Sequence, residues 1–330
     1  MRNSKLPIKR LGRIALFMVI LLIILLVLSE LSTMLAISDD KLVQKSNKSR
    51  YLIQREEANT IDVLITGDSL SYSTFSPMEL WHNQGISAYV SGQPGQNIVQ
   101  TYTFLQKALK TQSPKLVILE TDTMFNGMNN DKVTPIKFAA TEWVYDHLSI
   151  LRNHDMWKTL IAGKSYPQDN YKGFSFRCKL SPYTGGDYMQ ATEDVAPLPE
   201  VVTTYMDKIN QLCQENGAEL MLISSPSPKN FNYSRHNAIA QYAAKKGYRY
   251  LDLNLQLNEL GIDWSADSLD GGDHLNFRGA IKASDYLASY LAENYTLTDH
   301  REDSAYAEWN RLYKRYQKKI THSERKLSHG

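Results

Sequence analysis

One serine and one histidine, far apart in the chain, have the neighbours that acyl-transfer chemistry requires. Ser69 closes the tripeptide Gly-Asp-Ser at 67–69, and His274 ends the Gly-rich stretch 270–274. A serine nucleophile needs a base that takes its proton and an acid that orients that base. His274 could be the base, with Asp270 or Asp273 holding its ring. The tripeptide alone is a weak signal, because average composition supplies it by chance in roughly one chain of this size in ten.

The segments around these residues alternate between short apolar runs and amphipathic stretches. Short apolar runs that end at turn residues indicate buried strands, and strands alternating with helices indicate a parallel sheet. Because ligands bind beyond the carboxyl ends of such strands, Ser69 is placed where chemistry is usually done. Five strands are predicted, at 61–66, 86–91, 115–120, 219–224 and 248–252, with helices at 77–81, 98–110, 142–162, 200–215, 235–246 and 280–292.

The pattern divides the chain into five parts. We expect a basic cytoplasmic N-terminus at 1–13, a membrane anchor at 14–37, a stalk at 38–60, the α/β domain at 61–298 and a basic helical tail at 299–330. Within the domain, the strand signal disappears over about 125–199. A long insertion of this kind either forms a lid or binding region or has a merely structural role. The sequence does not distinguish between these two possibilities.

An apolar run near the N-terminus is long enough to cross a bilayer, which takes ~20 apolar residues in a helix. A cleaved signal peptide would have an apolar core of ~7–15 residues and a small-residue cleavage site, which 33–38 matches poorly. We therefore expect an uncleaved single-pass anchor. The basic N-terminus then lies in the cytoplasm, and the chain beyond residue 38 lies outside the membrane.

Composition sets further limits. The net charge of +2 points to no particular polyanionic partner, and we expect no nucleic acid, although positive charge gathers at both ends of the chain. The basic tail could lie on a membrane, meet anionic wall polymers or be a solvated helix face. Cys178 and Cys213 are too few for a disulfide framework and lack the spacing of a zinc site. No metal-binding motif or phosphate-binding loop is present, so no cofactor is expected.

Four short blocks together resemble the SGNH/GDSL hydrolase superfamily. They are Gly-Asp-Ser at 67–69, Gly-Gln-Asn at 95–97, Glu-Thr-Asp at 120–122, and the stretch from Asp270 through His274 to Gly279. The stretches 76–81 and 273–276 are similar to those of membrane-anchored members found in Gram-positive bacteria. The resemblance covers about residues 60–295. It implies a three-layer α/β/α, flavodoxin-like fold and serine esterase or acyltransferase chemistry.

By position, the resemblance implies that Ser69 is the nucleophile and His274 the base, with the backbone N–H groups of Ser69 and Gly95 as oxyanion donors. Family members usually place the orienting Asp three residues before the His, where this chain has Gly271. We prefer Asp270, because the two intervening glycines allow the loop to fold back. Asp273 is the alternative.

The third block departs from the family at the residue that normally donates to the oxyanion. An Asn is usual there, and this chain has Asp122. An ionised carboxylate has no proton to donate and repels developing negative charge. Asp122 is therefore protonated in a poorly solvated site, or Asn97 or Asn126 takes its role, or catalysis is weak.

The sequence thus predicts a membrane-anchored, extracytoplasmic serine esterase or acyltransferase. Its expected substrates are ester-linked acyl groups, with acetyl as the expected acyl group, on small esters or on cell-envelope glycans. An acyl-donor protein embedded in the membrane is a possible partner. The alternative is a catalytically weak or inactive glycan-binding or scaffolding protein of the same fold, which Asp122 favours.

Overall fold

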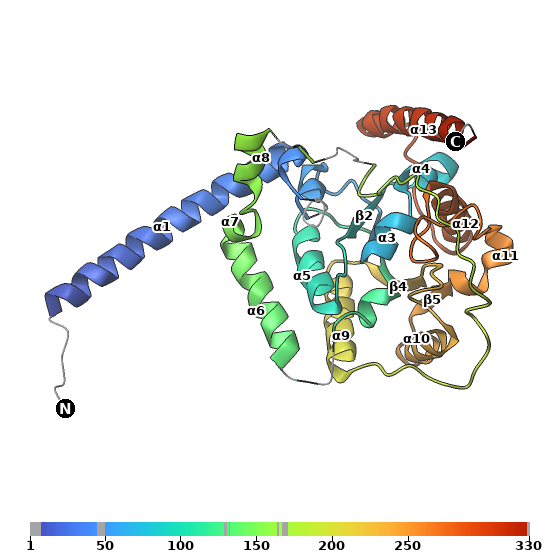
Figure 1. Ribbon diagram of the computed structural model, residues 1–330, viewed down its shortest axis with the longest axis horizontal. Coiled ribbons are helices and arrows are strands. Elements are labelled where there is room, and N and C mark those ends of the chain that lie inside the picture. Colours follow the sequence, from blue (N-terminus) through green and yellow to red (C-terminus); the bar gives the residue numbers. More distant parts are fainter. Residues whose placement is uncertain are drawn as a thin grey trace.

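A five-stranded, all-parallel sheet forms the centre of the computed structural model, which describes residues 8–44, 50–128, 131, 133–163, 165–166 and 171–328. The strand order is β2-β1-β3-β4-β5, and helices cover both faces (Figure 1). The predicted α/β fold with five strands is confirmed. The strands are β1 (Val63–Gly67), β2 (Ala88–Gly92), β3 (Leu116–Glu120), β4 (Glu219–Ser224) and β5 (Arg249–Asp252).

The strands form where apolar side chains alternate between two covered faces. Leu64, Val117 and Leu220 lie on one face, in a core that includes residues of several helices. Val63 and Leu116, which are register partners, lie on the other face with the remaining sheet-covering helices. The first face is covered by α5 (Ile98–Ala108), α9 (Glu200–Glu215) and α10 (Tyr233–Lys246), and the second by α3 (Ser69–Thr74), α4 (Pro77–Gln84) and α12 (Phe277–Asn294).

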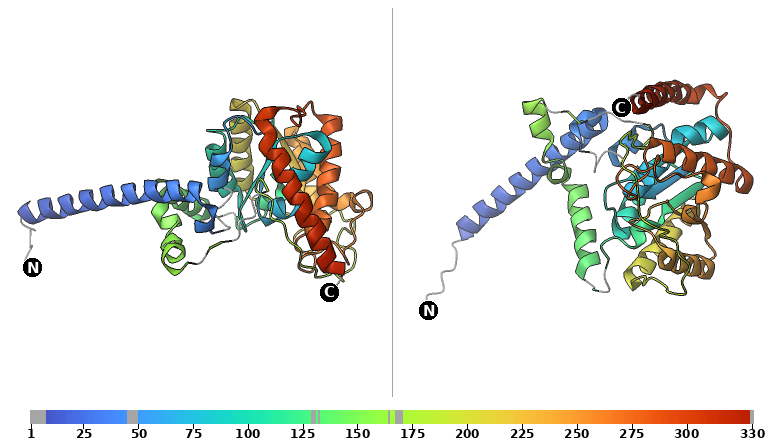
Figure 2. Two further views of the ribbon diagram at one scale, coloured as in Figure 1. Left: turned by 90° about the horizontal axis from the view of Figure 1, so that it is seen from above. Right: turned by 45° about the vertical axis from the view of Figure 1, so that its right-hand side comes forward.

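The N-terminal helix α1 (Ile8–Ser38) projects from the body, as Figures 1 and 2 show. By length and composition, residues Arg10–Ser38 could cross a membrane. Its last turns pack on α7 (Ser149–Arg152), where Ser149 Oγ donates to the Ser29 carbonyl at 2.6 Å. Of the expected basic segment 1–13, residues 1–7 lie outside the described residues.

The segment 38–60 differs from the expected stalk, because its second half belongs to the domain. Leu52 and Ile53 are buried in the main core. The neighbouring Arg50 forms buried ion pairs to Glu142 at 2.9 Å and Asp146 at 3.0 Å on the insertion helix α6 (Val133–His147). This docking is not evident from the sequence, because residues 38–60 are mostly polar and the contacts are made by a few apolar residues and one paired arginine.

The remaining elements frame the domain. The insertion adds α8 (Met156–Ala162) and an extended chain that leads to α9, and α11 (Leu257–Leu260) precedes the His274 loop. The C-terminal helix α13 (Ala307–Ser328) lies across the body on the side away from the tip of α1 (Figure 2). Its apolar face is buried, with Trp309 and Tyr316 in the core. The predicted tail is therefore a part of the folded domain.

Candidate active site

The turn after β1 places Ser69 at the carboxyl edge of the sheet. Ser69 is the first residue of α3, and Asp68 caps this helix by accepting the Leu70 N–H at 2.8 Å. Only glycine fits at the end of the strand, because a Cβ on Gly67 would lie 2.6 Å from the Glu120 Cβ. The first N–H groups of a helix have no partner within it, so the Ser69 N–H is not used by α3 itself.

The loop before α12 folds back and brings His274 to Ser69. Gly271 and Gly272 have φ angles of 75° and 90°, which side-chain-bearing residues rarely adopt. Asp270 Oδ1 accepts the His274 backbone N–H at 2.8 Å, and its Oδ2 lies 2.8 Å from His274 Nδ1. His274 Nε2 lies 2.8 Å from Ser69 Oγ. Ser69, His274 and Asp270 therefore form one continuous hydrogen-bonded chain.

The second candidate acid of this loop is held further away. Asp273 Oδ1 is 3.6 Å from His274 Nδ1, and it accepts a hydrogen bond from Asn230 Nδ2 at 2.6 Å. One ligand atom each from Asp270, Asp273 and His274 could also meet around a cation. Asp270 and His274 already have partners in the hydrogen-bonded chain to Ser69, and Asp273 is paired with Asn230. None of the three therefore depends on a cation for a partner.

Three carboxyl groups gather behind the nucleophile, where the ends of β1 and β3 meet. Burial, and then the charge of Asp122, raise the pKa of Asp68 to about 8. Burial and the charges of Asp68 and Asp122 also raise the pKa of the fully enclosed Glu120 well above its usual range. At neutral pH, Asp68 is therefore mainly protonated, and its O–H can donate to Asp122.

Arg235 forms an ion pair with Asp122 and so balances the buried negative charge of that carboxylate. Its Nη1 lies 2.8 Å from Asp122 Oδ1, and its guanidinium stacks over the Phe125 ring at 4.4 Å. Asp122 is almost fully buried, whereas Arg235 is partly exposed at the start of α10. The ion pair leaves no unpaired negative charge at this position. Sequence reasoning missed Arg235, and no motif or spacing marks it.

The other predicted oxyanion residues have different surroundings. Asn97 is buried and caps α5 by accepting the Gln100 N–H at 3.0 Å. Asn126 Nδ2 donates to Asp68 Oδ2 at 3.0 Å and to the Gln96 carbonyl at 3.3 Å. Gly95 lies in an exposed turn with φ 60° and open space at its Cβ position. The two amides thus serve the scaffold, which leaves backbone N–H groups as the candidate oxyanion donors.

Two further side chains beside Ser69 were missed from the sequence. Tyr72 lies one helical turn after Ser69, and its hydroxyl interacts with Ser69 and Arg177. Burial raises the pKa of Tyr72 to about 12, so the phenol stays neutral. The Arg177 guanidinium lies 5.8 Å from the centre of the Tyr72 ring. The i, i+3 spacing from Ser69 could have indicated Tyr72, but Arg177 comes from the insertion and no local pattern identifies it.

A cavity of about 420 Å³ opens beside the triad. Arg177, Cys178, Lys179, Leu269 and Asp270 line it. Two cations therefore border a space on the Asp270 side of the triad, and neither Ser69 nor His274 is among its lining residues.

Comparison with known proteins gives distant structural likenesses. No family model matches the chain, and no curated protein matches it by sequence. The chain is similar to a candidate acylhydrolase from Bacteroides fragilis, at 12% identity and a TM-score of 0.40, over 76% of this chain and 98% of that chain. It is also similar to a GDSL-like lipase from Bacteroides thetaiotaomicron, at 10% identity and a TM-score of 0.40, over 76% and 99%.

An acetyl xylan esterase is a further likeness, at 14% identity and a TM-score of 0.25, over 70% of this chain and 98% of that chain. The descriptions of these neighbours fall in the ester-hydrolase class that the motif blocks resemble. Likenesses of this size carry no argument about activity, so the functional conclusion rests on the geometry of the site.

Proposed function

We propose that the protein is a serine esterase or acyltransferase of the SGNH/GDSL hydrolase type. The observation that carries this proposal is the chain of 2.8 Å contacts from Asp270 through His274 to Ser69. Each contact has the length of a hydrogen bond, and together they supply a nucleophile, a base and an orienting acid.

The proposed reaction proceeds through an acyl-enzyme. Ser69 Oγ attacks the ester carbonyl carbon while its proton passes to His274 Nε2. The tetrahedral intermediate collapses, the C–O bond to the alcohol breaks, and His274 returns the proton to the leaving oxygen. Water or a sugar hydroxyl then attacks the acyl-Ser69, again through His274, and releases free acid or a new ester. The nature of this acceptor separates an esterase from an acyltransferase.

The backbone N–H groups of Ser69 and Gly95 are the proposed oxyanion donors. Donors fixed in position stabilise the charge that develops on the carbonyl oxygen. Asp122 does not oppose them in this scheme, because Arg235 balances its charge at 2.8 Å. This pairing supports activity over the alternative of an inactive scaffolding protein. Asp270 orients His274 and balances the imidazolium that forms during each transfer.

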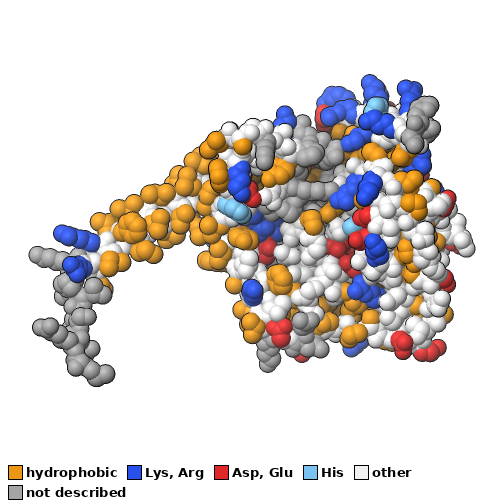
Figure 3. All heavy atoms as spheres, in the orientation of Figure 1, with side chains coloured by type: hydrophobic (Ala, Val, Ile, Leu, Met, Phe, Trp, Pro, Cys, Tyr) orange, Lys and Arg blue, Asp and Glu red, His pale blue; other side chains and the backbone are white. Residues whose placement is uncertain are grey.

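We further propose that the domain is anchored in the cell membrane and lies outside it. The surface along α1 is mostly apolar (Figure 3), and its large side chains are exposed to the surroundings. The adjoining α6 and α8 also expose Trp143, Trp157 and Ile161, at 62%, 56% and 80%. Exposed aromatic and aliphatic side chains beside an apolar helix suit the boundary of a bilayer.

An acylated envelope glycan is the proposed physiological substrate, and the acyl group is proposed to be acetyl. An acyl-donor protein within the membrane is the proposed partner if the reaction is a transfer. A multi-span protein that copurifies with the anchored chain would support the transferase form.

The test is hydrolysis of 4-nitrophenyl acetate by the full-length chain in detergent. Ser69→Ala should abolish the turnover seen with the wild type. The control is Ser73→Ala on the same helix, because the Ser73 hydroxyl is buried and has no hydrogen-bond partner in the described part of the chain. Equal rates for the wild type and Ser69→Ala would overturn the proposal.

A further inference from the structure

The three insertion helices α6, α7 and α8 expose most of the large apolar side chains that are exposed outside α1. Among the described residues beyond α1, ten such side chains are exposed, and seven of them lie on these helices. They are Val133, Ile136, Trp143, Leu151, Trp157, Leu160 and Ile161, and we call them the insertion face. Single exposed apolar residues are common on proteins, whereas a concentration of this kind marks an interaction surface.

The helix α6 is packed with charge on its inner side and apolar residues on its outer side. Val133, Ile136 and Trp143 recur with the helical period on the exposed side, and the first two are 72% and 68% exposed. Glu142, by contrast, is buried and paired with Arg50 at 2.9 Å. A surface helix in water usually has the opposite arrangement, with its apolar side toward the core. The outer side of α6 therefore suits surroundings other than water.

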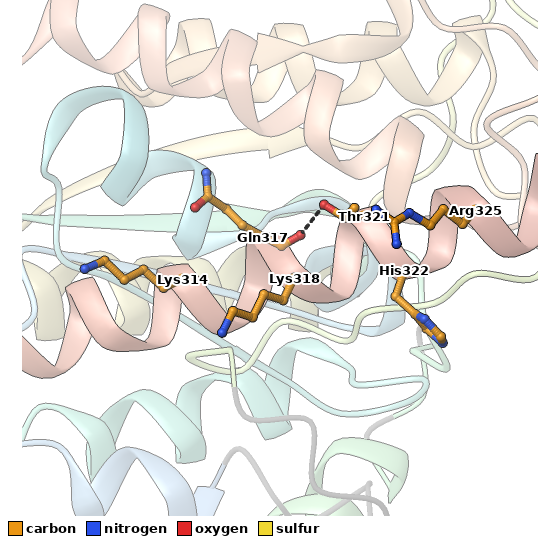
Figure 4. Close-up of a pocket in the computed structure, with 6 residues that line it drawn as sticks. All are labelled: Lys314, Gln317, Lys318, Thr321, His322 and Arg325. Carbon is orange, nitrogen blue, oxygen red and sulfur yellow. Dashed lines mark hydrogen bonds between the residues drawn. The ribbon is translucent and has the colours of Figure 1, made fainter.

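The C-terminal helix α13 shows the usual arrangement in the same chain. Its Trp309 and Tyr316 are buried, and the side chains that line a groove on its outer side are polar or charged (Figure 4). Lys314 and Lys318, both labelled in Figure 4, are exposed. The inverted orientation of α6 is thus a local property of the insertion and needs a local explanation.

The insertion face adjoins the apolar surface of α1. Ser149 Oγ on α7 donates to the Ser29 carbonyl at 2.6 Å and lies 2.9 Å from Ser32 Oγ, so α7 is held on α1 directly after its apolar run. From α7, α6 runs at a steep angle to α1 and along the domain, where it packs on α5 (Figures 1 and 2). When α1 crosses a bilayer, α6 therefore lies along the surface of that bilayer.

The chemistry of the insertion face fits the boundary layer of a bilayer. Tryptophan is enriched there, because its ring can meet acyl chains while its N–H meets water. Lys158 Nζ lies 5.8 Å from the centre of the Trp157 ring, and the His147 ring stacks on Trp143 at 4.3 Å. The insertion face has no acidic member, and both acids of α6 bind Arg50 on the side of the domain. Basic groups beside tryptophan, without outward acids, favour lipid headgroups.

We propose that the insertion face lies in the headgroup layer on the domain side of the membrane, as a second membrane contact beside α1. This inference rests on the proposed anchoring by α1 and adds lipid as a binding partner of the insertion. Because α7 is bonded to α1 and α6 is ion-paired to the domain, the two contacts together fix the orientation of the domain. Ser69 is then held at one height and one angle above the membrane surface.

Lipid-borne bromine tests this contact, because bromine quenches tryptophan fluorescence only at short range. The full-length chain would be reconstituted in vesicles of phosphatidylcholine and phosphatidylglycerol that carry bromine either near the headgroups or near the ends of the acyl chains. The helix α1 has no tryptophan, and Trp81 and Trp309 are buried in the domain. Bromine near the headgroups should quench about a third of the fluorescence, and more than bromine at the chain ends. Trp143→Phe with Trp157→Phe should remove most of this quenching.

Further variants show whether the contact belongs to the insertion face. Ile136→Glu with Ile161→Glu places two carboxylates in the face and should reduce the quenching at least about twofold. The matched control is Val195→Glu with Leu255→Glu, at exposed apolar positions elsewhere on the domain, and it should leave the quenching unchanged. Lys318→Trp on the outer side of α13, added to the Trp143→Phe and Trp157→Phe chain, should restore none of it. Circular dichroism melting would show that each variant is folded.

The outcomes separate this inference from the proposed function. The measurement needs no ester hydrolysis, so it does not depend on catalytic activity. If the chain does not float with the vesicles, the proposed anchoring fails and the inference fails with it. If the chain floats but Trp143 and Trp157 are not quenched, the anchoring stands and the inference alone is overturned.

Two other results would also overturn the inference. Stronger quenching by bromine at the chain ends would place the insertion face inside the bilayer. Quenching restored by Lys318→Trp would show that the domain touches lipid without a preferred face.

Discussion

Replacing one of the two acids near His274 should separate an orienting residue from a neighbour. Asp270→Asn and Asp273→Asn remove the same charge from the same loop, within three residues of each other. Asp270 contacts His274 twice, through the backbone N–H and through Nδ1, both at 2.8 Å. Asp273 approaches Nδ1 only to 3.6 Å and is occupied by Asn230. We expect activity to depend on Asp270.

The size of the effect follows from these contacts. A hydrogen bond to a charged group is worth about 1.5–3 kcal/mol, or roughly 10- to 150-fold in rate. The Asn amide can also donate to Nδ1 and favour the wrong tautomer, which costs about 10⁴-fold in serine proteases. Because Asp270 is 32% exposed, water takes over part of its role. We therefore expect kcat to fall about 10²- to 10³-fold for Asp270→Asn and less than about 5-fold for Asp273→Asn.

Initial rates with 4-nitrophenyl acetate at saturating and limiting concentrations would give kcat and KM separately. The loss should appear in kcat, because Asp270 acts on His274 and not on the bound ester. Circular dichroism melting of both variants would show whether the loop change unfolds the domain. The assignment is wrong if Asp273→Asn loses as much activity as Asp270→Asn while both variants remain folded.

Three other perturbations test the scaffold of the site. Arg235→Gln leaves the buried Asp122 charge unpaired and should lower the free energy of unfolding by about 1–3 kcal/mol in urea titrations, and a double variant with Asp122→Asn should recover part of the loss. Between about pH 4 and pH 8, folded Asp68 keeps a proton that the unfolded chain has lost. Its contribution to stability therefore declines as the pH rises through this window, and melting temperatures of Asp68→Asn should depend less on pH than those of the wild type. Gly67→Ala forces a Cβ to 2.6 Å from a side-chain carbon of β3 and should lower the urea midpoint, whereas Gly186→Ala, which has open space, should not.

The sequence predicts the frame of this protein well because hydrophobic periodicity is a local property. All five strands lie within two residues of their predicted positions. The meeting of Ser69 and His274 could be anticipated, since both follow strands whose carboxyl ends share one edge of the sheet. The two glycines before Asp273 also indicated that Asp270 could reach back to the histidine ring.

The residues that the sequence did not reveal come from packing between distant segments. Arg235 reaches Asp122 across 113 positions, and Arg177 enters the site from an insertion without periodic pattern. Neither has a neighbour in the chain that marks its partner. The docking of 38–60 was missed for the same reason, because its composition is mostly polar and a few apolar residues, among them Leu52 and Ile53 in the main core, carry it.

The burial of Tyr316 on α13 determines when the domain can finish folding. This side chain has no exposed surface and shares one core with Ile53 and Trp81. The ribosome makes α13 after the rest of this core, so the growing polypeptide cannot close the core before α13 has been made. Ser69 is also made 205 residues before His274. A nascent chain therefore carries Ser69 before His274 exists, and the proposed ester chemistry must await synthesis of the His274 loop.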